Sequence, residues 1–257
     1  MRSNLRLYVL TRISSLKNKE DILKQVGALP ALVLDPSDEV DRLSKSHSEM
    51  FRDRTCYGRT IAAHLPFRGI DPICRDPFIR SYSLSVFQKS IRVISELPCS
   101  TVLLHSFLPP SLPRFEAGNV LEELITTIKP YIAEAKRLGL SVLIENTFER
   151  YCDSFAKLVE QLDVHVVLDV PRIIEFSKDS PADWMNQLSH RVAGMHIYGT
   201  RGDDEHCVFS EQDEGWFRPA LGDLGRKDLL FLIDASTEEI VPSANTLHQL
   251  LGNVEES

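Results

Sequence analysis

Segments with the pattern of short β-strands alternate along the whole chain with segments of helical pattern. Strands are expected at residues 5–10, 29–34, 61–64, 102–105, 142–145, 166–169, 192–198 and 229–233. Helices are expected at residues 18–26, 39–51, 77–97, 117–138, 154–162, 171–189 (one or two, broken near Pro181) and 238–251. Strands that alternate with helices pair in parallel through right-handed crossovers. Because the order gives no sign of a switch point, it favours a closed (β/α)8 barrel over an open doubly wound sheet.

The length and the longest irregular stretch refine this expectation. A barrel of this type needs about 250 residues, so the 257 residues predict a single domain, 1–257, with a ragged end from about residue 252. Residues 199–228 carry five glycines and no clear periodicity. A long polar stretch of this kind is typical of a lid or a binding loop.

Charge and composition favour a water-soluble protein of the cytoplasm. The formal net charge is −8 with no basic run, which argues against a general nucleic-acid coat and leaves room for local contact. The five cysteines form no C-x-x-C pair, as is usual for reduced thiols. No apolar run approaches the roughly 18 residues that cross a bilayer, so no membrane partner is expected.

Six of the expected strands end on an imidazole or a carboxylate. These residues are His64, His105, Glu145, Asp169, His196 and Asp234. The carboxyl ends of the strands of a parallel barrel lie at one mouth, where the active sites of such barrels are found. Histidine and carboxylate side chains are ligands of divalent metals. The pattern therefore predicts a metal-dependent site at this mouth.

The last four of the six offer mostly oxygen ligands. Glu145, Asp169, His196 and Asp234 suit Mn²⁺ or Mg²⁺ and tolerate Zn²⁺ or Co²⁺. His64 and His105 could hold a second, zinc-like ion with Glu145 as a bridge, or could hydrogen-bond a substrate hydroxyl or carbonyl.

Three acidic residues have competing interpretations as ordinary structure. Asp169 precedes Val170-Pro171 and could simply cap a helix. A capping role is less favoured for Asp234, because Ser236 or Thr237 is the better N-cap for the helix that follows. Asp204 and His206, in the 199–228 stretch, could bind a further metal or belong to a solvated acidic loop.

Short motifs in a fixed order resemble a known superfamily. They are His64-Leu65-Pro66-Phe67, Leu103-Leu104-His105, Leu143-Ile144-Glu145-Asn146, Val167-Leu168-Asp169, Met195-His196-Ile197-Tyr198, Asp204-Glu205-His206 and Leu221-Gly222-Asp223-Leu224-Gly225. From about Ala62 to Asp234 the chain resembles the xylose-isomerase-like barrels. That superfamily includes sugar isomerases and epimerases, and also apurinic endonucleases of the endonuclease-four type.

The resemblance implies roles that differ between its two branches. In the ketose 3-epimerase branch Glu145, Asp169, His196 and Asp234 match a one-metal site, with the two outer carboxylates, Glu145 and Asp234, as an acid/base pair. In the endonuclease branch His64, His105 and Glu145 would hold one zinc. Glu145, Asp169, His196 and Asp234 would hold a second zinc, and Asp204 and His206 would belong to a third.

Two positions depart from that pattern. Asp234 stands where both branches usually have Glu, one methylene longer. Arg172 stands where the endonuclease pattern has a third-zinc histidine, and a guanidinium cannot ligate a metal. Arg172 suits an anionic substrate group such as a phosphate or a carboxylate, with Arg201 as a second cation.

We therefore expect a divalent-metal-dependent (Mn, Mg, Zn or Co) sugar or sugar-phosphate isomerase or epimerase. The metal would polarise the substrate carbonyl, Glu145 would remove the α-proton to give an enediolate, and Asp234 would return it. One alternative is an apurinic-site endonuclease, a zinc phosphodiesterase, with nucleic acid as a less favoured partner. Another is a non-catalytic, degenerate barrel. The sequence leaves open the sugar, the identity and number of the metal ions, and the oligomeric state.

Overall fold

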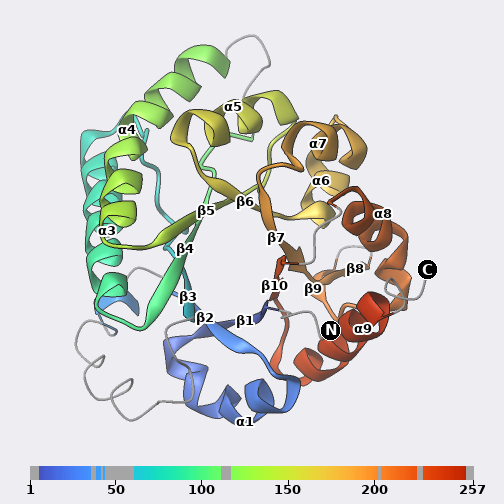
Figure 1. The fold of residues 1–257 in the computed structure, drawn as a ribbon. Coiled ribbons are helices and arrows are strands. Elements are labelled where there is room, and N and C mark those ends of the chain that lie inside the picture. The colour runs from blue at the N-terminus through green and yellow to red at the C-terminus, as the bar shows by residue number, and fades with distance from the viewer. Residues whose placement is uncertain are drawn as a thin grey trace.

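The computed structural model describes residues 6–35, 39–41, 43, 61–110, 117–201, 204–224 and 228–252. Within these residues, eight parallel strands close into a barrel in the order β1-β10-β7-β6-β5-β4-β3-β2 (Figure 1). The strands are β1 (Arg6–Arg12), β2 (Leu29–Val33), β3 (Ile61–His64), β4 (Cys99–His105), β5 (Ser141–Glu145), β6 (His165–Leu168), β7 (Val192–Ile197) and β10 (Leu230–Ile233). The predicted (β/α)8 barrel is confirmed.

Helices surround the strands on the outside of the barrel (Figure 1). They are α1 (Leu16–Val26), α3 (Pro77–Ser95), α4 (Ala117–Arg137), α5 (Cys152–Leu162), α6 (Val170–Phe176), α7 (Pro181–Leu188), α8 (Glu214–Leu224) and α9 (Ile240–Gly252). The break near Pro181 is confirmed, because Ser180 caps a new helix there. Residues 39–41 and 43 are helical. The rest of the helix expected at 39–51, and the tail after residue 252, lie outside the described residues.

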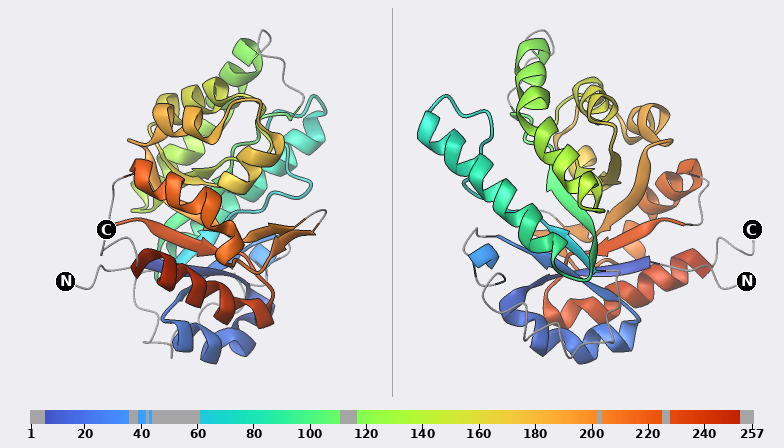
Figure 2. Two further views of the ribbon diagram at one scale, coloured as in Figure 1. Left: turned by 90° about the vertical axis from the view of Figure 1, so that its right-hand side faces the viewer. Right: turned by 60° about the vertical axis from the view of Figure 1, so that its left-hand side comes forward.

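The stretch 199–228 is more regular than the sequence suggested. β8 (Gly199–Arg201) and β9 (Asp204–Cys207) pair as an antiparallel hairpin, which projects from one end of the barrel (Figure 2). The helix α8 follows. The sequence pattern therefore did not reveal the hairpin or the helix within this stretch. A Cβ on Gly199 would collide with the carbonyl oxygen of Val208, so only glycine fits where the hairpin begins.

The barrel has two apolar layers, and alternation along each strand separates them. Val102 and Leu104 of β4 belong to the layer between strands and helices. Leu103 belongs to the smaller cluster inside the barrel, which comprises Tyr8, Ala31, Ala62, Leu103, Leu143, Val167, Leu230 and Leu232. Since successive strand side chains point to opposite faces, the residue two positions after each interior residue also points inward.

This alternation decides which side chains reach the mouth of the barrel. Two positions beyond the interior residues Ala62, Leu103, Leu143, Val167 and Leu232 stand His64, His105, Glu145, Asp169 and Asp234. The same count from Leu10, which packs against the interior cluster, leads to Arg12. The polar mouth therefore continues the interior rows of the barrel.

No helix in the described part of the chain combines the length and the apolar character needed to cross a bilayer.

Candidate active site

A pocket of about 660 Å³ opens at the carboxyl end of the strands. All six of the predicted strand-end residues line it: His64, His105, Glu145, Asp169, His196 and Asp234. Arg172 and His206 line it as well. The structure therefore brings to one place the side chains that the sequence pattern grouped. The side chain of Asp204, in β9, lies outside the described ones.

Glu145, Asp169 and His196 form the first of two groups with metal-ligand spacing. One ligand atom from each lies within 4.8 Å of the others, and all three residues are buried. His196 Nδ1 lies 3.0 Å from Glu145 Oε1 and 3.5 Å from Asp169 Oδ2. Burial lowers the pKa of His196, but the charges of Glu145 and Asp169 outweigh it and raise this pKa well above its usual value. The two carboxylates thus attract a cation to the space that they share.

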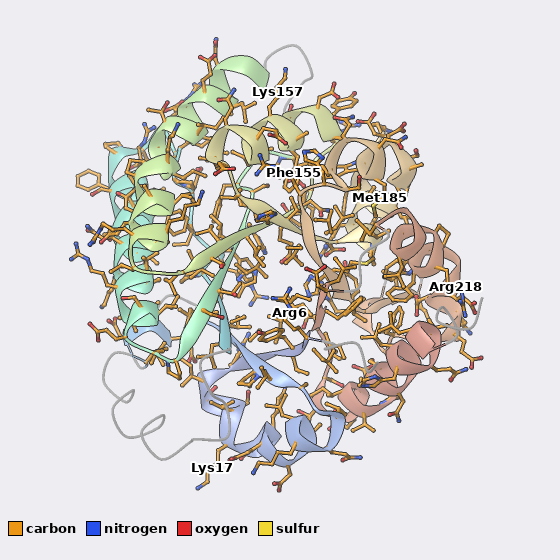
Figure 3. All side chains as sticks on the ribbon, viewed as in Figure 1. Arg6, Lys17, Phe155, Lys157, Met185 and Arg218 are labelled. Atoms are coloured by element: carbon orange, nitrogen blue, oxygen red, sulfur yellow. The ribbon has the colours of Figure 1, made fainter. Side chains whose placement is uncertain are left out.

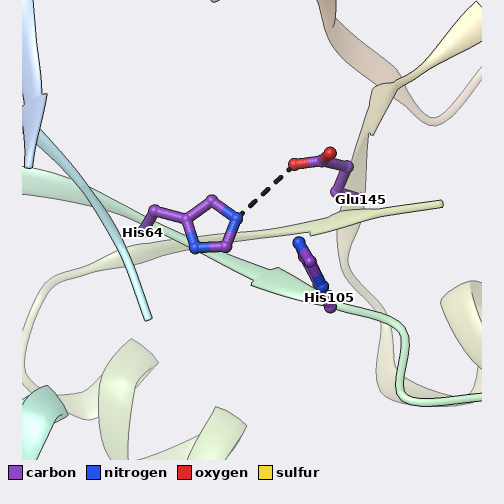
Figure 4. A group of neighbouring side chains, drawn as sticks. All are labelled: His64, His105 and Glu145. Atoms are coloured by element: carbon purple, nitrogen blue, oxygen red, sulfur yellow. Dashed lines mark ion pairs between the residues drawn. The ribbon is translucent and has the colours of Figure 1, made fainter. Parts of the chain in front are cut away.

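His64, His105 and Glu145 form the second group, again with ligand atoms within 4.8 Å of one another. His64 Nδ1 donates to the carbonyl oxygen of Leu65 at 2.8 Å, which leaves a lone pair on Nε2. That Nε2 faces Glu145 Oε2 at 3.6 Å (Figure 4). Burial, followed by the electrostatic interaction with the neighbouring His64, lowers the pKa of His105 to about 3. His105 is therefore neutral at physiological pH, which is the form that binds metals.

Glu145 belongs to both groups. Buried polar atoms without hydrogen-bond partners around it indicate whether the site fits a metal. Glu145 Oε2 and His196 Nε2 are buried and have no hydrogen-bond partner among the described residues. A buried polar atom without a partner is costly. Imidazoles and carboxylates are the ligands of zinc and related divalent ions, and a metal that binds His196 would displace its proton. The residues therefore fit a divalent metal.

Asp169 serves as a helix cap and also belongs to the metal-ligand group. Its Oδ1 accepts a hydrogen bond from the backbone N of Arg172 at 3.0 Å and caps α6, while Oδ2 faces His196. The capping interpretation is therefore confirmed, and Asp169 remains a candidate metal ligand. Ser236 caps the short turn before α9, as expected, so Asp234 is not needed there.

Two residues that the sequence analysis gave no role hold Asp169 in place. The hydroxyl of Tyr198 donates to both carboxylate oxygens of Asp169, at 2.9 and 3.0 Å. The side-chain amide of Asn146 bonds both the backbone N and the backbone O of Asp169. Their position was the available signal, because Asn146 directly follows Glu145 and Tyr198 lies two residues after His196.

Asp234 lies beside the two groups and belongs to neither of them within the described residues. Its Oδ2 is 4.0 Å from His196 Nε2 and 3.0 Å from His206 Nδ1. Burial raises the pKa of Asp234, but the hydrogen bond from His206 and the charge of His196 lower it below its usual value overall. The short aspartate side chain thus faces a histidine pair from the edge of the site.

Arg172 lines the pocket on the other side of the His206 ring from Asp234. Its Nη2 lies 3.1 Å from His206 Nε2, and its guanidinium lies over the rings of Phe148 and Phe176. His206 itself has a left-handed backbone, with a φ of 58°. Arg201, expected as a second cation, instead bonds the Val208 carbonyl and Asp213, which follow β9, and is not among the residues that line the pocket.

Arg12 and Lys19, to which the sequence analysis gave no role, line the pocket as well, and so does Arg68. Lys19 lies on the buried face of α1 with Leu16, Leu23 and Val26. The sequence carries a signal for this position, because Lys19 falls at helical spacing within a row of apolar residues that face the core. Burial lowers the pKa of Lys19, while Asp234 and Glu238 raise it by smaller amounts.

Solved structures similar to this chain share its fold. The TTHB071 protein from Thermus thermophilus, soaked with ZnCl₂, is 21% identical with a TM-score of 0.82, over 97% of this chain and 99% of that one. A D-tagatose 3-epimerase-like protein is 18% identical with a TM-score of 0.78, over 98% and 99%. The IOLI protein with a binding zinc atom is 12% identical with a TM-score of 0.71, over 97% and 99%.

Sequence comparison points the same way. An uncharacterized protein of Methanocaldococcus jannaschii, MJ1311, is 21% identical over 220 residues, which cover 80% of this chain and 74% of that protein. The family model described as xylose isomerase-like TIM barrel matches residues 34–240. This match spans most of the barrel and includes all six strand-end residues, from His64 to Asp234. The chain therefore belongs to the xylose isomerase-like TIM barrel family.

Proposed function

We propose that this protein is a divalent-metal-dependent sugar isomerase or epimerase. The observation that carries the proposal is the position of Glu145, which is shared by two groups with metal-ligand spacing at the base of the pocket. The similarity to a D-tagatose 3-epimerase-like protein and to a zinc-binding protein supports it.

Glu145, Asp169 and His196 would hold the metal, with Asp234 beside them. A bound divalent ion would polarise the carbonyl of a sugar and make the neighbouring C–H more acidic. Glu145 and Asp234 both have lowered pKa values, so both are carboxylates that can accept a proton at neutral pH. Since they stand on different sides of His196, they suit proton removal and return at a carbon between them.

The test follows the proton directly. The protein loaded with Mn²⁺ or Zn²⁺ is incubated in D₂O with a panel of ketoses and aldoses, and NMR follows exchange at the carbon next to the carbonyl. We expect exchange and isomer formation with at least one sugar. Glu145→Gln should lower both by about 10²-fold or more, because loss of a positioned base typically costs 10²–10⁴-fold.

A matched control separates chemistry from general damage. Glu122, on the exposed face of α4, lies outside the pocket, so Glu122→Gln should leave exchange unchanged. Full activity of Glu145→Gln, or no exchange with any sugar in the loaded protein, would contradict the proposal. The second result would favour a non-catalytic barrel.

A zinc phosphodiesterase is the second candidate, and His64, His105 and Glu145 favour it as a second metal group. A third zinc beside His206 is disfavoured, because the guanidinium of Arg172 contacts His206 and would repel a cation. Two or more zinc ions per chain, together with incision of a duplex that carries an abasic site, would support this function. One metal ion and no incision would support the sugar enzyme.

A further inference from the structure

The β8–β9 hairpin brings the ring of His206 to the edge of the pocket. His206 belongs to β9, in the hairpin that projects from one end of the barrel (Figure 2). Its Nδ1 lies 3.0 Å from Asp234 Oδ2, and its Nε2 lies 3.1 Å from Arg172 Nη2. The three residues all line the pocket. The imidazole therefore stands between a carboxylate and a guanidinium, with one nitrogen toward each.

The contact with Arg172 determines the tautomer of this ring. A guanidinium has donors and no acceptor. Arg172 Nη2 therefore donates to Nε2 of His206, which carries a lone pair, and the ring proton is on Nδ1. The described residues offer this buried Nδ1 no partner besides the carboxylate of Asp234. The N–H of the histidine thus points to the candidate acid/base group.

Arg172 is itself held in one orientation. Its Nη1 lies 3.8 Å from Glu175 Oε2. Its guanidinium carbon lies 5.1 Å from the centre of the Phe148 ring and 5.4 Å from that of Phe176. Cations are attracted to aromatic faces at such distances. Arg172 is thus a paired and packed side chain, and it offers His206 a fixed donor.

The face and the backbone of His206 are fixed as well. Its ring stacks on Tyr198, with centroids 4.1 Å apart and planes inclined by 27°. Its φ of 58° is in the left-handed region, which is uncommon for a residue with a side chain. Such conformations persist where the surrounding contacts favour them, often at functional sites. The hairpin therefore presents this ring in one place and one orientation.

Asp234 depends on this ring for its own position. It belongs to neither group with metal-ligand spacing among the described residues. Its Oδ2 lies 4.0 Å from His196 Nε2, compared with 3.0 Å from His206 Nδ1. Of the polar side chains that the structure describes, His206 is therefore the closest partner of this carboxylate.

We propose that His206 is a positioning residue, which Arg172 holds in the Nδ1–H tautomer and which keeps Asp234 in place for proton transfer. The inference rests on the proposed function for the role of Asp234. In one direction Glu145 removes the proton, and the C–H electron pair passes into the enediolate. Asp234 in its acid form then gives a proton to the other face of the carbon, and the pair forms the new C–H bond. Exchange with water restores both groups.

The first arm of the test observes the tautomer without any substrate. Nitrogen-15 NMR of the full-length protein loaded with Zn²⁺ gives the signals of the ring nitrogens, and their absence in His206→Asn assigns them. We expect a proton on Nδ1 and none on Nε2 at neutral pH. A proton on Nε2, a doubly protonated ring or a zinc-bound ring would overturn the inference.

A pair of arginine variants tests whether Arg172 holds the ring. Arg172→Met keeps the aliphatic stem and has no donor, so the Nε2 signal of His206 should shift. Arg218 provides the matched control, because it pairs with Glu214 on α8 as Arg172 pairs with Glu175 on α6. It lies on the outer side of the barrel (Figure 3) and does not line the pocket. Arg218→Met should leave the signal unchanged. An unchanged signal in Arg172→Met would contradict the proposed contact.

The second arm follows both members of a pair of epimeric sugars in D₂O with the metal-loaded protein. His206→Ala should slow their interconversion by about tenfold or more, since misplacing a reacting group is costly, with KM within about threefold of the wild type. The epimer whose hydrogen faces Glu145 should keep its exchange rate. The other epimer should lose about tenfold, because its hydrogen faces the misplaced Asp234. Equal losses for both epimers, or no loss, would overturn the positioning role.

Two further variants separate positioning from general damage. His206→Asn keeps an N–H donor on a residue that tolerates a left-handed backbone, so interconversion should return to within about threefold of the wild type. His190→Ala removes a histidine that bonds Glu160 at 2.9 Å on the exposed surface, and it should change nothing. If His206→Ala does not fold, Arg172→Met should show the same difference between the epimers.

The two arms keep this inference distinct from the proposed function. A wild-type protein with an Nδ1–H ring but no exchange with any sugar would overturn the isomerase or epimerase and the proton-transfer role of His206. The contact with Arg172 would stand. Exchange and interconversion by the wild type that are unaffected by His206→Ala would overturn only the role of His206.

Discussion

The ligand groups around Glu145 depend on residues that touch no substrate. Leu65 fixes the tautomer of His64 through its carbonyl oxygen. Tyr198 donates to both oxygens of Asp169, and Asn146 fixes the backbone of the same residue. Such partners orient metal ligands and tune their basicity. The affinity of the site therefore depends on more residues than its ligands.

Tyr198→Phe tests this dependence. The change removes one hydroxyl, and with it both hydrogen bonds to Asp169, while the ring that packs against His206 at 4.1 Å remains. Metal affinity should fall by about 10- to 100-fold, as is usual when a ligand loses its partner. Competition with a fluorescent zinc chelator measures it. Tyr82→Phe, at a half-exposed side chain on α3, is the control and should not change the affinity. Equal affinities for the two variants would contradict the role given to Tyr198.

The buried carboxyl group of Glu149 should make the free energy of unfolding depend on pH. Burial raises its pKa to about 7, against hydrogen bonds from Ser106 and the Thr147 backbone N that lower it. The folded protein thus holds this proton more tightly than the unfolded chain. Its contribution is favourable at low pH and is lost as pH rises from about 4.5 to about 7.

The variant Glu149→Gln removes this titration, because a carboxamide resembles the neutral acid. Between pH 5 and pH 8, the wild type should lose roughly 1–3 kcal/mol of unfolding free energy relative to the variant. Urea denaturation at both pH values measures the difference. A difference between the two proteins that stays constant with pH would show that Glu149 is ionised throughout.

At the scale of single residues, sequence reasoning found the side chains that end strands and missed those placed by other elements. The position of Glu145 follows from a local pattern, an apolar run followed by a polar residue. Arg12 was missed because the expected strand ended at residue 10, whereas β1 extends to Arg12. Lys19 reaches the pocket because α1 packs with that face inward, and this packing is a tertiary property.

Among the elements, α3 carries a clear local start signal. Asp76 caps it by accepting from the backbone N of Phe78 at 2.8 Å and of Ile79 at 3.4 Å, with Pro77 in the first turn. Asp76→Ala should therefore destabilise the protein by about 1 kcal/mol, whereas Asp76→Ser should retain most of the stability. Urea unfolding of the two variants compares them. An alanine variant as stable as the wild type would show that the cap contributes nothing.

The helix α8 shows where reading elements from the sequence failed. Phe217, Ala220, Leu221 and Leu224 are buried and recur at the spacing of a helix face. Gly215, Pro219 and Gly222 lie in the same eleven residues and gave the impression of a loop. Packing of the apolar face stabilises this helix despite its unfavourable residues. The barrel strands, in contrast, were predictable because apolar runs recur at regular intervals between helices.

For the whole molecule, barrel closure turns a pattern along the chain into a site. Side chains that alternate inward along each strand form the apolar interior. The next inward position of five strands carries an imidazole or a carboxylate, and His196 of β7 joins them at the pocket. Residues from His64 to Asp234 thereby line a single pocket. The order of elements made this convergence predictable. The membership of the two ligand groups was not predictable. Glu145 belongs to both groups and Asp234 to neither, and this depends on how far each side chain reaches.

The central claim is that these strands converge on a divalent metal held by Glu145, Asp169 and His196. Anomalous diffraction from crystals soaked in Mn²⁺ or Zn²⁺, recorded at the absorption edge of the metal, tests it most directly. We predict a strong peak within about 2.0–2.3 Å of ligand atoms from all three residues, and its loss in Glu145→Gln. Metal peaks found only elsewhere on the protein, or none at all, would contradict the account.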